Sequence, residues 1–397
     1  MEKLINELEK VSKIINISPT KELYKKRAVI YNKLEKFDLA MNDYENIIKL
    51  DSNDYSAYYE RACEWYNWKI YYLDELPKRK EIEYNTIEYL KKSINLKETS
   101  KGYYRIAEIY FNLLDDNEKS LEYCNKALSI EDNENYKIEE LRLQGQIYNE
   151  IGKYNKSIQV FSDILNKVKD EDAFIFRGIA HCNLASDIGD VEESRKEYIN
   201  ALSDFQNVIL LDKDNVFCYM RMAQILKEVF DEVESVVKCY TRVISLEPWN
   251  KEANEYMANY FFDNGNYIKA VQCIENIGEL DSDLAYLDRL KAESYYELGK
   301  YNKALIIYNK ILDEKKDKYI YDYRGDVYLK LGEYDKAILD YKKFIKYYPE
   351  SGGAHYRLGQ AYMQKGDKRN ALKMLNKALK LLPENKKIID LIDKINS

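Results

Sequence analysis

The feature that most constrains this chain of 397 residues is a period of 34 residues. Residues 318–351 and 352–385 carry small residues, bulky residues and a proline at the same offsets. The matching positions are Gly325, Gly332, Ala337, Tyr341 and Pro349 in the first copy, and Gly359, Gly366, Ala371, Leu375 and Pro383 in the second. Such a period is typical of stacked repeats, in which each repeat packs only on its neighbours. It therefore predicts an extended surface rather than one core around an active-site pocket.

The same pattern can be followed toward the N-terminus and predicts ten repeats. They are residues 21–54, 55–99, 100–137, 138–170, 171–215, 216–250, 251–284, 285–317, 318–351 and 352–385. We expect residues 1–20 and 386–397 to form capping helices that cover the two terminal repeats. The C-terminal segment has isoleucines at helical spacing on the side expected to face the array, namely Ile388, Ile389, Ile392 and Ile395.

Each repeat is expected to be a pair of helices, A and B, joined by a tight turn. A glycine stands where helix A should end and where the backbone needs a positive φ. These glycines are Gly152, Gly265, Gly299, Gly332 and Gly366. Pro349 and its counterparts cannot continue helix B. Small residues such as Gly325 and Ala337, beside bulky ones such as Tyr341, predict a close approach of the two helices.

This pattern resembles the tetratricopeptide repeat (TPR) family, whose motif is W-x2-L-G-x2-Y, then A-x3-F, then Ala and Pro. The resemblance covers residues 21–385. Other aromatic residues replace the first Trp of the motif, as in Tyr24, Tyr58, Tyr103, Phe174, Tyr219 and Tyr321. This replacement helps to explain the 39 tyrosines as packing residues. The resemblance implies an all-α fold: a right-handed α-solenoid of about ten helix-turn-helix units with capping helices, and a concave groove lined by the A helices.

The groove positions implied by the family give a surface that changes along the chain. Aromatic, apolar and amide side chains occupy them in the second to sixth repeats: Tyr59, Tyr66, Asn67, Tyr104, Phe111, Asn112, Ile175, Ile179, Phe217 and Met220. Carboxylates dominate in the seventh to ninth repeats: Glu252, Glu255, Asp263, Glu293, Glu297, Asp322 and Asp326. Arg289 and Lys330 oppose these acids. A concave lining of one sign attracts the opposite charge, so we expect a partner that is apolar at one end and basic at the other. The alternative is that the acidic faces only keep the array in solution.

One known form of the family's groove clamps the C-terminal carboxylate of a peptide with Lys, Arg and Asn side chains. Lys25, Lys101 and Arg105 match its basic positions, but Val29 and Glu60 occupy two of its Asn positions. The clamp is therefore incomplete, and the Glu60 carboxylate would repel such a ligand.

Two repeats, 55–99 and 171–215, are 45 residues long, 11 more than the period. Eleven residues make close to three helical turns, so both helices can lengthen while their buried faces stay in phase. We expect turns near Pro77 and Gly189 in these extensions. They are either tolerated variation in length or a docking surface, for which the first offers exposed aromatic candidates: Trp65, Trp68, Tyr71 and Tyr72.

The composition limits the classes of function. A net charge of −7 and a pI near 5.4 disfavour binding to nucleic acid, which needs clustered Lys and Arg. No apolar run is long enough to span a membrane, and residues 1–20 contain no apolar core of a secretory signal. The six cysteines are widely spaced, as expected for reduced thiols packed on helices. We therefore expect a cytoplasmic protein that binds neither nucleic acid nor membrane.

Catalysis finds little support in the sequence. His181 and His355 fall where the repeat normally places packing aromatics. Cys182 follows His181 directly, and neighbouring side chains on a helix diverge, so the two cannot act as a nucleophile and its base. Phosphate-binding loops, hydrolase elbows and metal-ligand clusters are absent from the sequence. We therefore expect no enzymatic activity, no cofactor and no metal site.

The sequence as a whole predicts a non-enzymatic scaffold that binds a protein or peptide partner in its groove, and we expect a monomer. One alternative is a regulatory or peptide-sensing subunit of a separate enzyme or complex. A second is an RNA-binding helical repeat protein, which the acidic groove disfavours. The identity of the partner and the biological process stay open.

Overall fold

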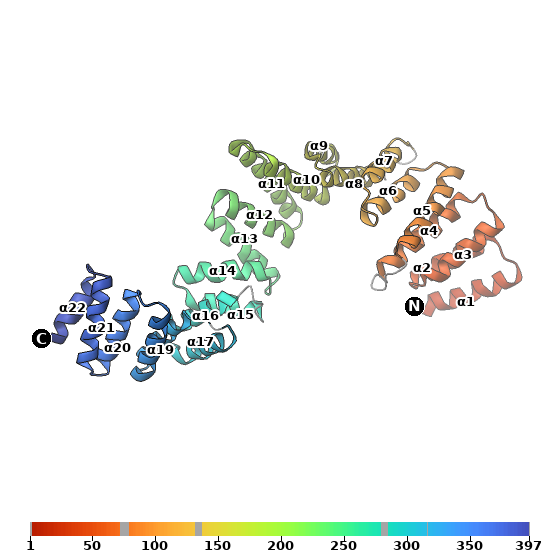
Figure 1. Cartoon of the computed structure of the whole chain (residues 1–397). Helices are drawn as coiled ribbons and strands as arrows, with labels where there is room; N and C mark the ends of the chain where they lie inside the picture. The colour runs from red at the N-terminus through yellow and green to blue at the C-terminus, as the bar shows by residue number, and fades with distance from the viewer. Residues whose placement is uncertain (1, 72–78, 132–136, 279–284, 316, 397) are drawn as a thin grey trace. The chain divides into compact units, whose positions relative to one another are not determined.

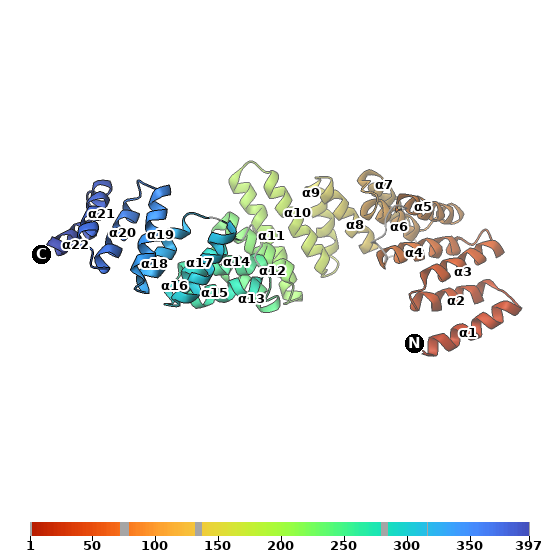
Figure 2. The same ribbon diagram turned by 60° about the horizontal axis from the view of Figure 1, so that its bottom comes forward.

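The computed structural model describes residues 2–71, 79–131, 137–278, 285–315 and 317–396. The regular secondary structure in these ranges is helical throughout. The chain forms two compact parts, an N-terminal part, Met1–Lys213, and a C-terminal part, Asp214–Ser397. Within each part, helices that follow one another in the chain pack side by side (Figures 1 and 2). The predicted all-α repeat fold is confirmed.

The helices of the N-terminal part are α1 (Glu2–Ile17), α2 (Lys21–Lys33), α3 (Phe37–Leu50), α4 (Tyr55–Tyr71), α5 (Arg79–Leu96), α6 (Ser100–Asn112), α7 (Asn117–Leu128), α8 (Lys137–Glu150), α9 (Tyr154–Leu165), α10 (Glu171–Asp187) and α11 (Val191–Leu211).

The helices of the C-terminal part are α12 (Val216–Ile225), the π-helix η1 (Leu226–Phe230), α13 (Val233–Leu246), α14 (Lys251–Asp263), α15 (Tyr267–Ile277), α16 (Ala285–Glu297), α17 (Tyr301–Lys315), α18 (Ile320–Lys330), α19 (Tyr334–Tyr347), α20 (Gly352–Gln364), α21 (Lys368–Leu381) and α22 (Lys386–Asn396).

Small residues allow the two helices of a pair to approach closely. A methyl group added to Gly325 on α18 would lie 2.7 Å from a ring carbon of Tyr341 on α19. The same substitution at Gly145 on α8 would meet the ring of Phe161 at 2.6 Å. Both distances are too short for a real side chain, so glycine is required at these two positions, where a ring of helix B packs against helix A. The predicted close approach is confirmed.

The turn between helices A and B uses the predicted glycines. All five have a positive φ, between 69° and 88°: Gly152, Gly265, Gly299, Gly332 and Gly366. Three other turns place a non-glycine residue in the left-handed region, namely Glu35, Asp115 and Asp231, with φ of 58°, 52° and 53°. The left-handed residue lets the chain reverse directly into helix B.

Buried ion pairs join helix A to helix B in some pairs. Arg27 on α2 donates two hydrogen bonds to the carboxylate of Asp43 on α3, at 2.6 and 2.8 Å. Arg324 on α18 does the same to Asp340 on α19, at 2.7 and 2.9 Å. Both aspartates are 1% exposed. In each pair the arginine precedes the small residue, and the aspartate precedes the ring that packs on it.

An equivalent ion pair shows how the second long repeat, residues 171–215, accommodates its extra residues. Arg177 on α10 donates to Asp204 on α11 at 2.6 and 2.9 Å, in the same two-bond geometry. The two residues are 27 apart in sequence, where Arg324 and Asp340 are 16 apart, so the difference is 11 residues. Helices α10 and α11 have lengthened to 17 and 21 residues, and the chain turns between them at Gly189, as predicted. The extension therefore leaves the buried faces of both helices in phase.

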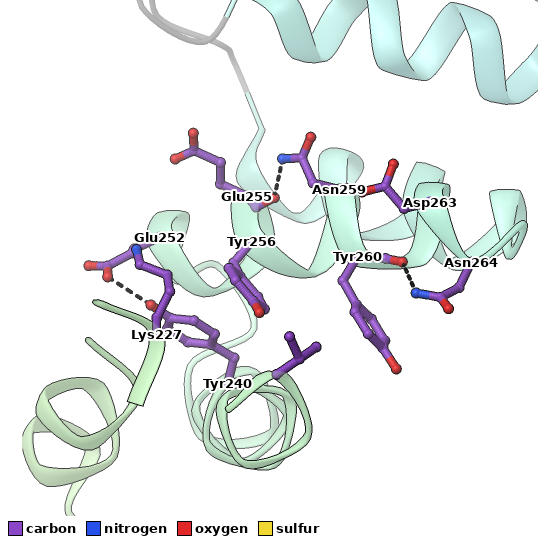
Figure 3. A pocket seen from close by; sticks show the side chains of 10 residues that line it. Lys227, Tyr240, Glu252, Glu255, Tyr256, Asn259, Tyr260, Asp263 and Asn264 are labelled. Atoms are coloured by element: carbon purple, nitrogen blue, oxygen red, sulfur yellow. Dashed lines mark hydrogen bonds between the residues drawn. The ribbon is translucent and has the colours of Figure 1, made fainter. Parts of the chain in front are cut away.

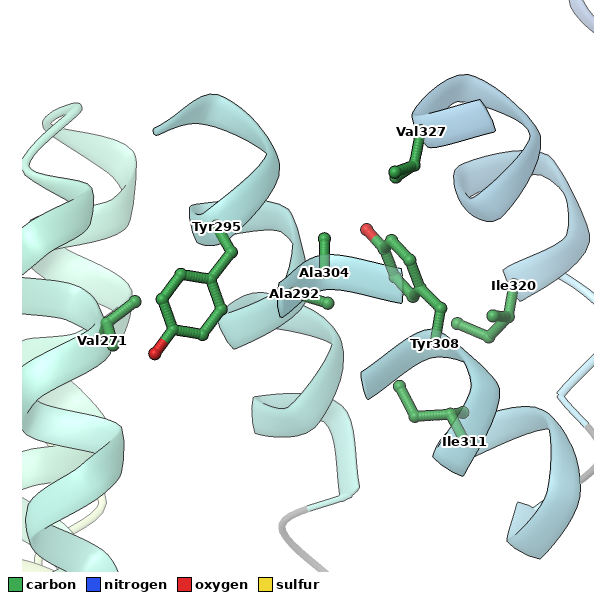
Figure 4. Close-up of a cluster of buried hydrophobic side chains, with 8 residues drawn as sticks. All are labelled: Val271, Ala292, Tyr295, Ala304, Tyr308, Ile311, Ile320 and Val327. Atoms are coloured by element: carbon green, nitrogen blue, oxygen red, sulfur yellow. The ribbon is translucent and has the colours of Figure 1, made fainter. Parts of the chain in front are cut away.

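Tyrosine rings fill much of the core. Figure 4 shows one buried cluster, to which α15, α16, α17 and α18 contribute. Tyr308 lies at its centre and is 1% exposed, and Tyr295 packs beside Val271. Tyr240 and Tyr341 are also fully buried. The prediction that many tyrosines are packing residues is confirmed.

Helices α1 and α22 lie at the ends of the described array. Val11 and Ile15 on α1 are buried against Ile30 on α2. Ile388 and Ile395 on α22 are buried against α21 residues. The sequence also placed Ile389 on the packed side, but this residue is 39% exposed, because the helical turn rotates it away from α21.

Candidate functional site

The predicted groove tyrosines of α4, Tyr59 and Tyr66, are half-buried, and each ring contacts a positively charged side chain of α6. The ammonium group of Lys101 lies 4.3 Å from the ring centre of Tyr59. The guanidinium group of Arg105 lies 5.1 Å from the ring centre of Tyr66. Both rings pack against a core cluster shared by α4, α5 and α6. The side chain of Asn67 lies outside the described residues.

The remaining groove residues of the N-terminal part lie on α6 and α10. Tyr104 and Phe111 are half-buried and pack against a cluster between α6, α7 and α8. Asn112 is exposed at the end of α6, and Ile175 and Ile179 are half-buried on α10. The half-buried side chains are therefore packed on one side and exposed to solvent on the other. They are Tyr104, Phe111, Ile175 and Ile179.

In the C-terminal part, α12 continues into the π-helix η1, which had not been predicted. Phe217 on α12 is 44% exposed, and Met220 is half-buried. The left-handed turn residue Asp231 stands 15 positions after the first residue of its repeat, whereas Gly265 stands 14 positions after its own. The π-helix absorbs this extra residue, and such insertions are frequent at functional sites.

A cavity of about 660 Å³ opens beside α14 (Figure 3). Three predicted groove carboxylates line it, those of Glu252, Glu255 and Asp263. The rings of Tyr256 and Tyr260, one helical turn apart, both point from α14 toward α13. The structure thus brings the acids of α14 together with two tyrosines that were not predicted as groove residues.

Neutral donors hold two of these carboxylates. The Tyr240 hydroxyl donates to Glu252 Oε1 at 2.9 Å, and the Tyr286 hydroxyl donates to Glu255 Oε1 at 2.6 Å. Burial, and then the Glu252 carboxylate, raise the pKa of Tyr240, so its hydroxyl remains a donor at neutral pH. Among the described residues, no Lys or Arg forms an ion pair with either carboxylate or with Asp263, which is exposed. Within the described residues, the acids of α14 therefore have neutral hydrogen-bond donors rather than a cationic partner.

The acids of α16 differ from one another. The Arg289 Nε atom lies 3.3 Å from Glu293 Oε1, one helical turn away on the same helix. Burial raises the pKa of Glu293, although the Arg289 charge acts in the opposite direction. Glu297 is exposed near the end of α16. Only part of the predicted charge of this helix is thus available to a ligand.

The acids of α18 are neutralised from within the chain. Arg357 on α20 forms an ion pair with Asp322, and its Nε atom lies 3.5 Å from Asp326 Oδ1. The Tyr341 hydroxyl donates to Asp326 Oδ1 at 2.6 Å. Burial raises the pKa of both aspartates. A second cavity of about 630 Å³ lies here, lined by Asp326, Arg357 and Lys330 among others, so its lining has mixed charge.

Arg357 was not among the predicted groove residues. It lies nine residues before Gly366, one position beyond the groove position that Asp322 occupies in its own repeat. The sequence could have revealed the role of Arg357 only through a comparison of the charged residues on the A helices of adjacent repeats. The acidic stretch predicted for the seventh to ninth repeats is thus concentrated on α14.

Both histidines are buried, and each has a polar atom within hydrogen-bond distance. His181 Nδ1 lies 2.5 Å from Glu197 Oε2, and His355 Nε2 lies 2.9 Å from the carbonyl oxygen of Pro349. None of the six cysteines forms a disulfide. In the described ranges, no group of three or more His, Cys, Asp or Glu side chains could hold a metal ion. Likewise, none of the helices described is long and apolar enough to cross a membrane.

The aromatic residues proposed for docking in the first long repeat fall mostly outside the described residues. This holds for the side chains of Trp68 and Tyr71, and for Tyr72 and Pro77 altogether. Trp65 is half-buried on α4. The docking hypothesis for this repeat therefore stays a prediction.

Comparison with known families finds the tetratricopeptide repeat in several places. Two tetratricopeptide repeat models match, one at residues 324–386 and the other at residues 22–54 and 100–134. A model of the anaphase-promoting complex, cyclosome, subunit 3, matches residues 231–311. The chain is 24% identical over 331 residues to a TPR repeat-containing protein of Methanocaldococcus jannaschii. The match covers 80% of this chain and 55% of that relative, so the chain spans about half of the relative's length.

Solved structures of similar fold include YrrB, described as a TPR protein with an unusual peptide-binding site. It is 20% identical, with a TM-score of 0.41, over 47% of this chain and 96% of that protein. The MamA protein is 23% identical, with a TM-score of 0.38, over 44% of this chain and 96% of that one. The anaphase-promoting complex hetero-tetramer Cut9–Hcn1 is 16% identical, with a TM-score of 0.36, over 99% of this chain and 82% of that one.

Proposed function

Because the chain is a tetratricopeptide repeat protein, we propose that it is a non-enzymatic scaffold that binds a peptide or a helix of a protein partner along its A helices. The observation that carries this proposal is the α14 cavity, which has the size of a ligand site and whose acids form no ion pair with a Lys or Arg among the described residues. An A helix that needed its polar residues only for solubility would not place three carboxylates and two tyrosines around one cavity.

The partner segment that meets the C-terminal part is basic. Glu252, Glu255 and Asp263 supply excess negative charge over the one lysine that also lines their cavity, Lys227. A concave surface of one sign concentrates oppositely charged ligands and speeds their association. This part of the surface selects Lys-rich or Arg-rich segments and repels acidic ones.

The partner segment that meets the N-terminal part is apolar or aromatic. Tyr104, Phe111, Ile175 and Ile179 each expose part of an apolar side chain on α6 or α10. Exposed aromatic and aliphatic groups on a rigid helix give a peptide a contact of low entropic cost. The N-terminal part would thus bind an apolar segment of the partner, and the C-terminal part would bind a basic segment.

A selection from random peptides of 12 residues on the immobilised full chain tests this proposal. We expect the selected peptides to be enriched in Arg and Lys and to carry at least one aromatic or aliphatic anchor. The basic peptides should compete with one another for the chain, since they share the acidic surface of α14. A selection that yields no binder, or yields acidic peptides, would contradict the proposed function.

A further inference from the structure

We propose that the exposed face of α21 binds a short acidic segment of a protein partner. Four cations of this helix form the surface, and together they are called the basic stripe: Arg369, Lys373, Lys377 and Lys380. Helix α21 is the second helix of its pair, so this surface lies outside the groove of the A helices. The inference therefore does not depend on the proposed function.

The basic stripe runs along α21 on the side opposite to its buried face. Successive residues of an α-helix are rotated by about 100°, so the four cations fall within about 80° of one another. The buried residues of the helix are Ala371, Leu375 and Ala378, which point the other way. All four cations are exposed to solvent. With a rise of about 1.5 Å per residue, the stripe is about 16 Å long.

The chain provides no counterions for the basic stripe. Other exposed lysines of the C-terminal part have them, since Lys336 pairs with Glu333 and Lys365 pairs with Asp335. Within the described part of the chain, no carboxylate forms an ion pair with any residue of the stripe. The carboxylate of Asp367, at the N-terminus of α21, instead accepts two hydrogen bonds from Asn370. The positive charge of the stripe is thus available to another molecule.

The stability of the helix does not explain this arrangement. Arg369, Lys373 and Lys377 follow one another at intervals of four residues, where like charges destabilise a helix. Arg369 is also the second residue of α21, where the helix dipole favours anions over cations. The other second helices are the odd-numbered helices from α3 to α19, and each contains at least one Asp or Glu, whereas α21 contains none. A binding role accounts for cations that the helix itself disfavours.

An acidic protein segment matches the stripe in charge and in length. About five residues of an extended chain, or about eleven of a helix, span 16 Å. A membrane surface fits less well, because a helix in a lipid interface exposes large apolar side chains, and those of α21 are buried or half-buried. A long RNA strand also fits less well, because it would meet a chain whose net charge is −7.

The test uses the full chain at low salt and fluorescein-labelled octaglutamate, with octaglutamine as the uncharged counterpart. Fluorescence anisotropy should show octaglutamate binding at least about tenfold more tightly than octaglutamine, because several charge pairs form along the stripe. Equal affinity for the two peptides would overturn the inference.

Lys373→Gln combined with Lys377→Gln should weaken octaglutamate binding about fivefold, because each exposed ion pair contributes only modestly. Arginine at both positions keeps the charge and should leave the affinity within twofold. The matched control is Lys10→Gln combined with Lys13→Gln on α1, which removes two exposed lysines from one helix and changes the net charge equally. The control should also bind within twofold of the parent, and thermal melting checks the folding of each variant.

Two outcomes would contradict the inference at the level of the site or of the partner. If the two glutamine variants bind octaglutamate alike, the basic stripe is excluded as the binding surface. If a 12-nucleotide RNA or phosphatidylserine vesicles bind more tightly than octaglutamate and lose affinity in the Lys373→Gln, Lys377→Gln variant, the partner is not an acidic protein segment.

Discussion

At Glu64, on α4, the fold holds a carboxyl group away from water, and no cation of the described part of the chain forms an ion pair with it. The residue is 3% exposed, and Asn32 on α2 donates to its Oε1 atom at 2.7 Å. The other oxygen has no hydrogen-bond partner among the described residues. Burial, and then the nearby Glu60 carboxylate, raise the pKa of Glu64 to about 7.

This raised pKa makes the stability of the N-terminal part depend on pH. The folded state holds the proton more tightly than the unfolded state, so the stabilisation is present below pH 4.5 and is lost as the pH rises to about 7. Glu64→Gln should therefore raise the free energy of unfolding at pH 8 by about 1–3 kcal/mol and change little at pH 4. Urea denaturation at both pH values measures this difference. The exposed Glu22→Gln serves as the control, and an equal response of the two variants would contradict the assignment.

The Arg324–Asp340 pair gives a second prediction at this scale. Arg324→Met leaves the 1%-exposed Asp340 carboxylate without its counterion, so we expect a loss of about 3–5 kcal/mol in urea denaturation. Adding Asp340→Leu should recover most of that loss, because an apolar pair of similar volume avoids the desolvation of both charges. A single variant as stable as the parent would show that the pair contributes nothing.

The sequence could predict those residues whose role follows from their own repeat. Gly325 and Tyr341 recur at fixed spacing, and the structure confirms that the glycine makes room for the ring. Arg357 could not be predicted in the same way, because its role depends on Asp322 in the preceding repeat. Contacts between repeats arise from stacking geometry, which a pattern within one repeat does not contain.

At the scale of the element, the turn between helices A and B requires a left-handed residue. Gly265 has a φ of 71°, and a methyl group added there would meet no atom within 4 Å. Gly265→Ala should therefore lose about 1 kcal/mol through backbone strain alone. Gly189→Ala also has open space and a φ outside the left-handed region, so it should cost nothing. Thermal denaturation of both variants compares them, and equal melting temperatures would contradict the role of the turn.

The π-helix η1 shows where the element-scale prediction failed. The 34-residue pattern predicts the same regular α-helix for every A helix. The repeat 216–250, however, is one residue longer than the period. The chain absorbs this residue as Leu226–Phe230 rather than as a longer turn. The extra length was visible in the sequence, but a period alone does not tell whether a helix or a turn accepts an insertion. The 11-residue insertion was predictable because it preserves the helical phase.

At the scale of the whole molecule, the net charge is −7, but the predicted groove acids differ in whether a cation of the chain pairs with them. The acids of α18 are bound by Arg357, and Glu293 on α16 is paired with Arg289. The acids of α14 have no such partner among the described residues and face a cavity. The predicted change from an aromatic to an acidic groove remains a proposal, and within it the structure favours α14 as the acidic centre.

The affinity of a selected basic peptide for the full chain, measured at low and at high salt, tests the central claim most directly. Recognition of a basic segment by unpaired carboxylates should weaken about tenfold between about 50 and 200 mM sodium chloride, because salt screens exposed charges. Isothermal titration calorimetry gives both affinities on the same protein. An affinity that does not change with salt would contradict an acidic groove that binds a basic partner.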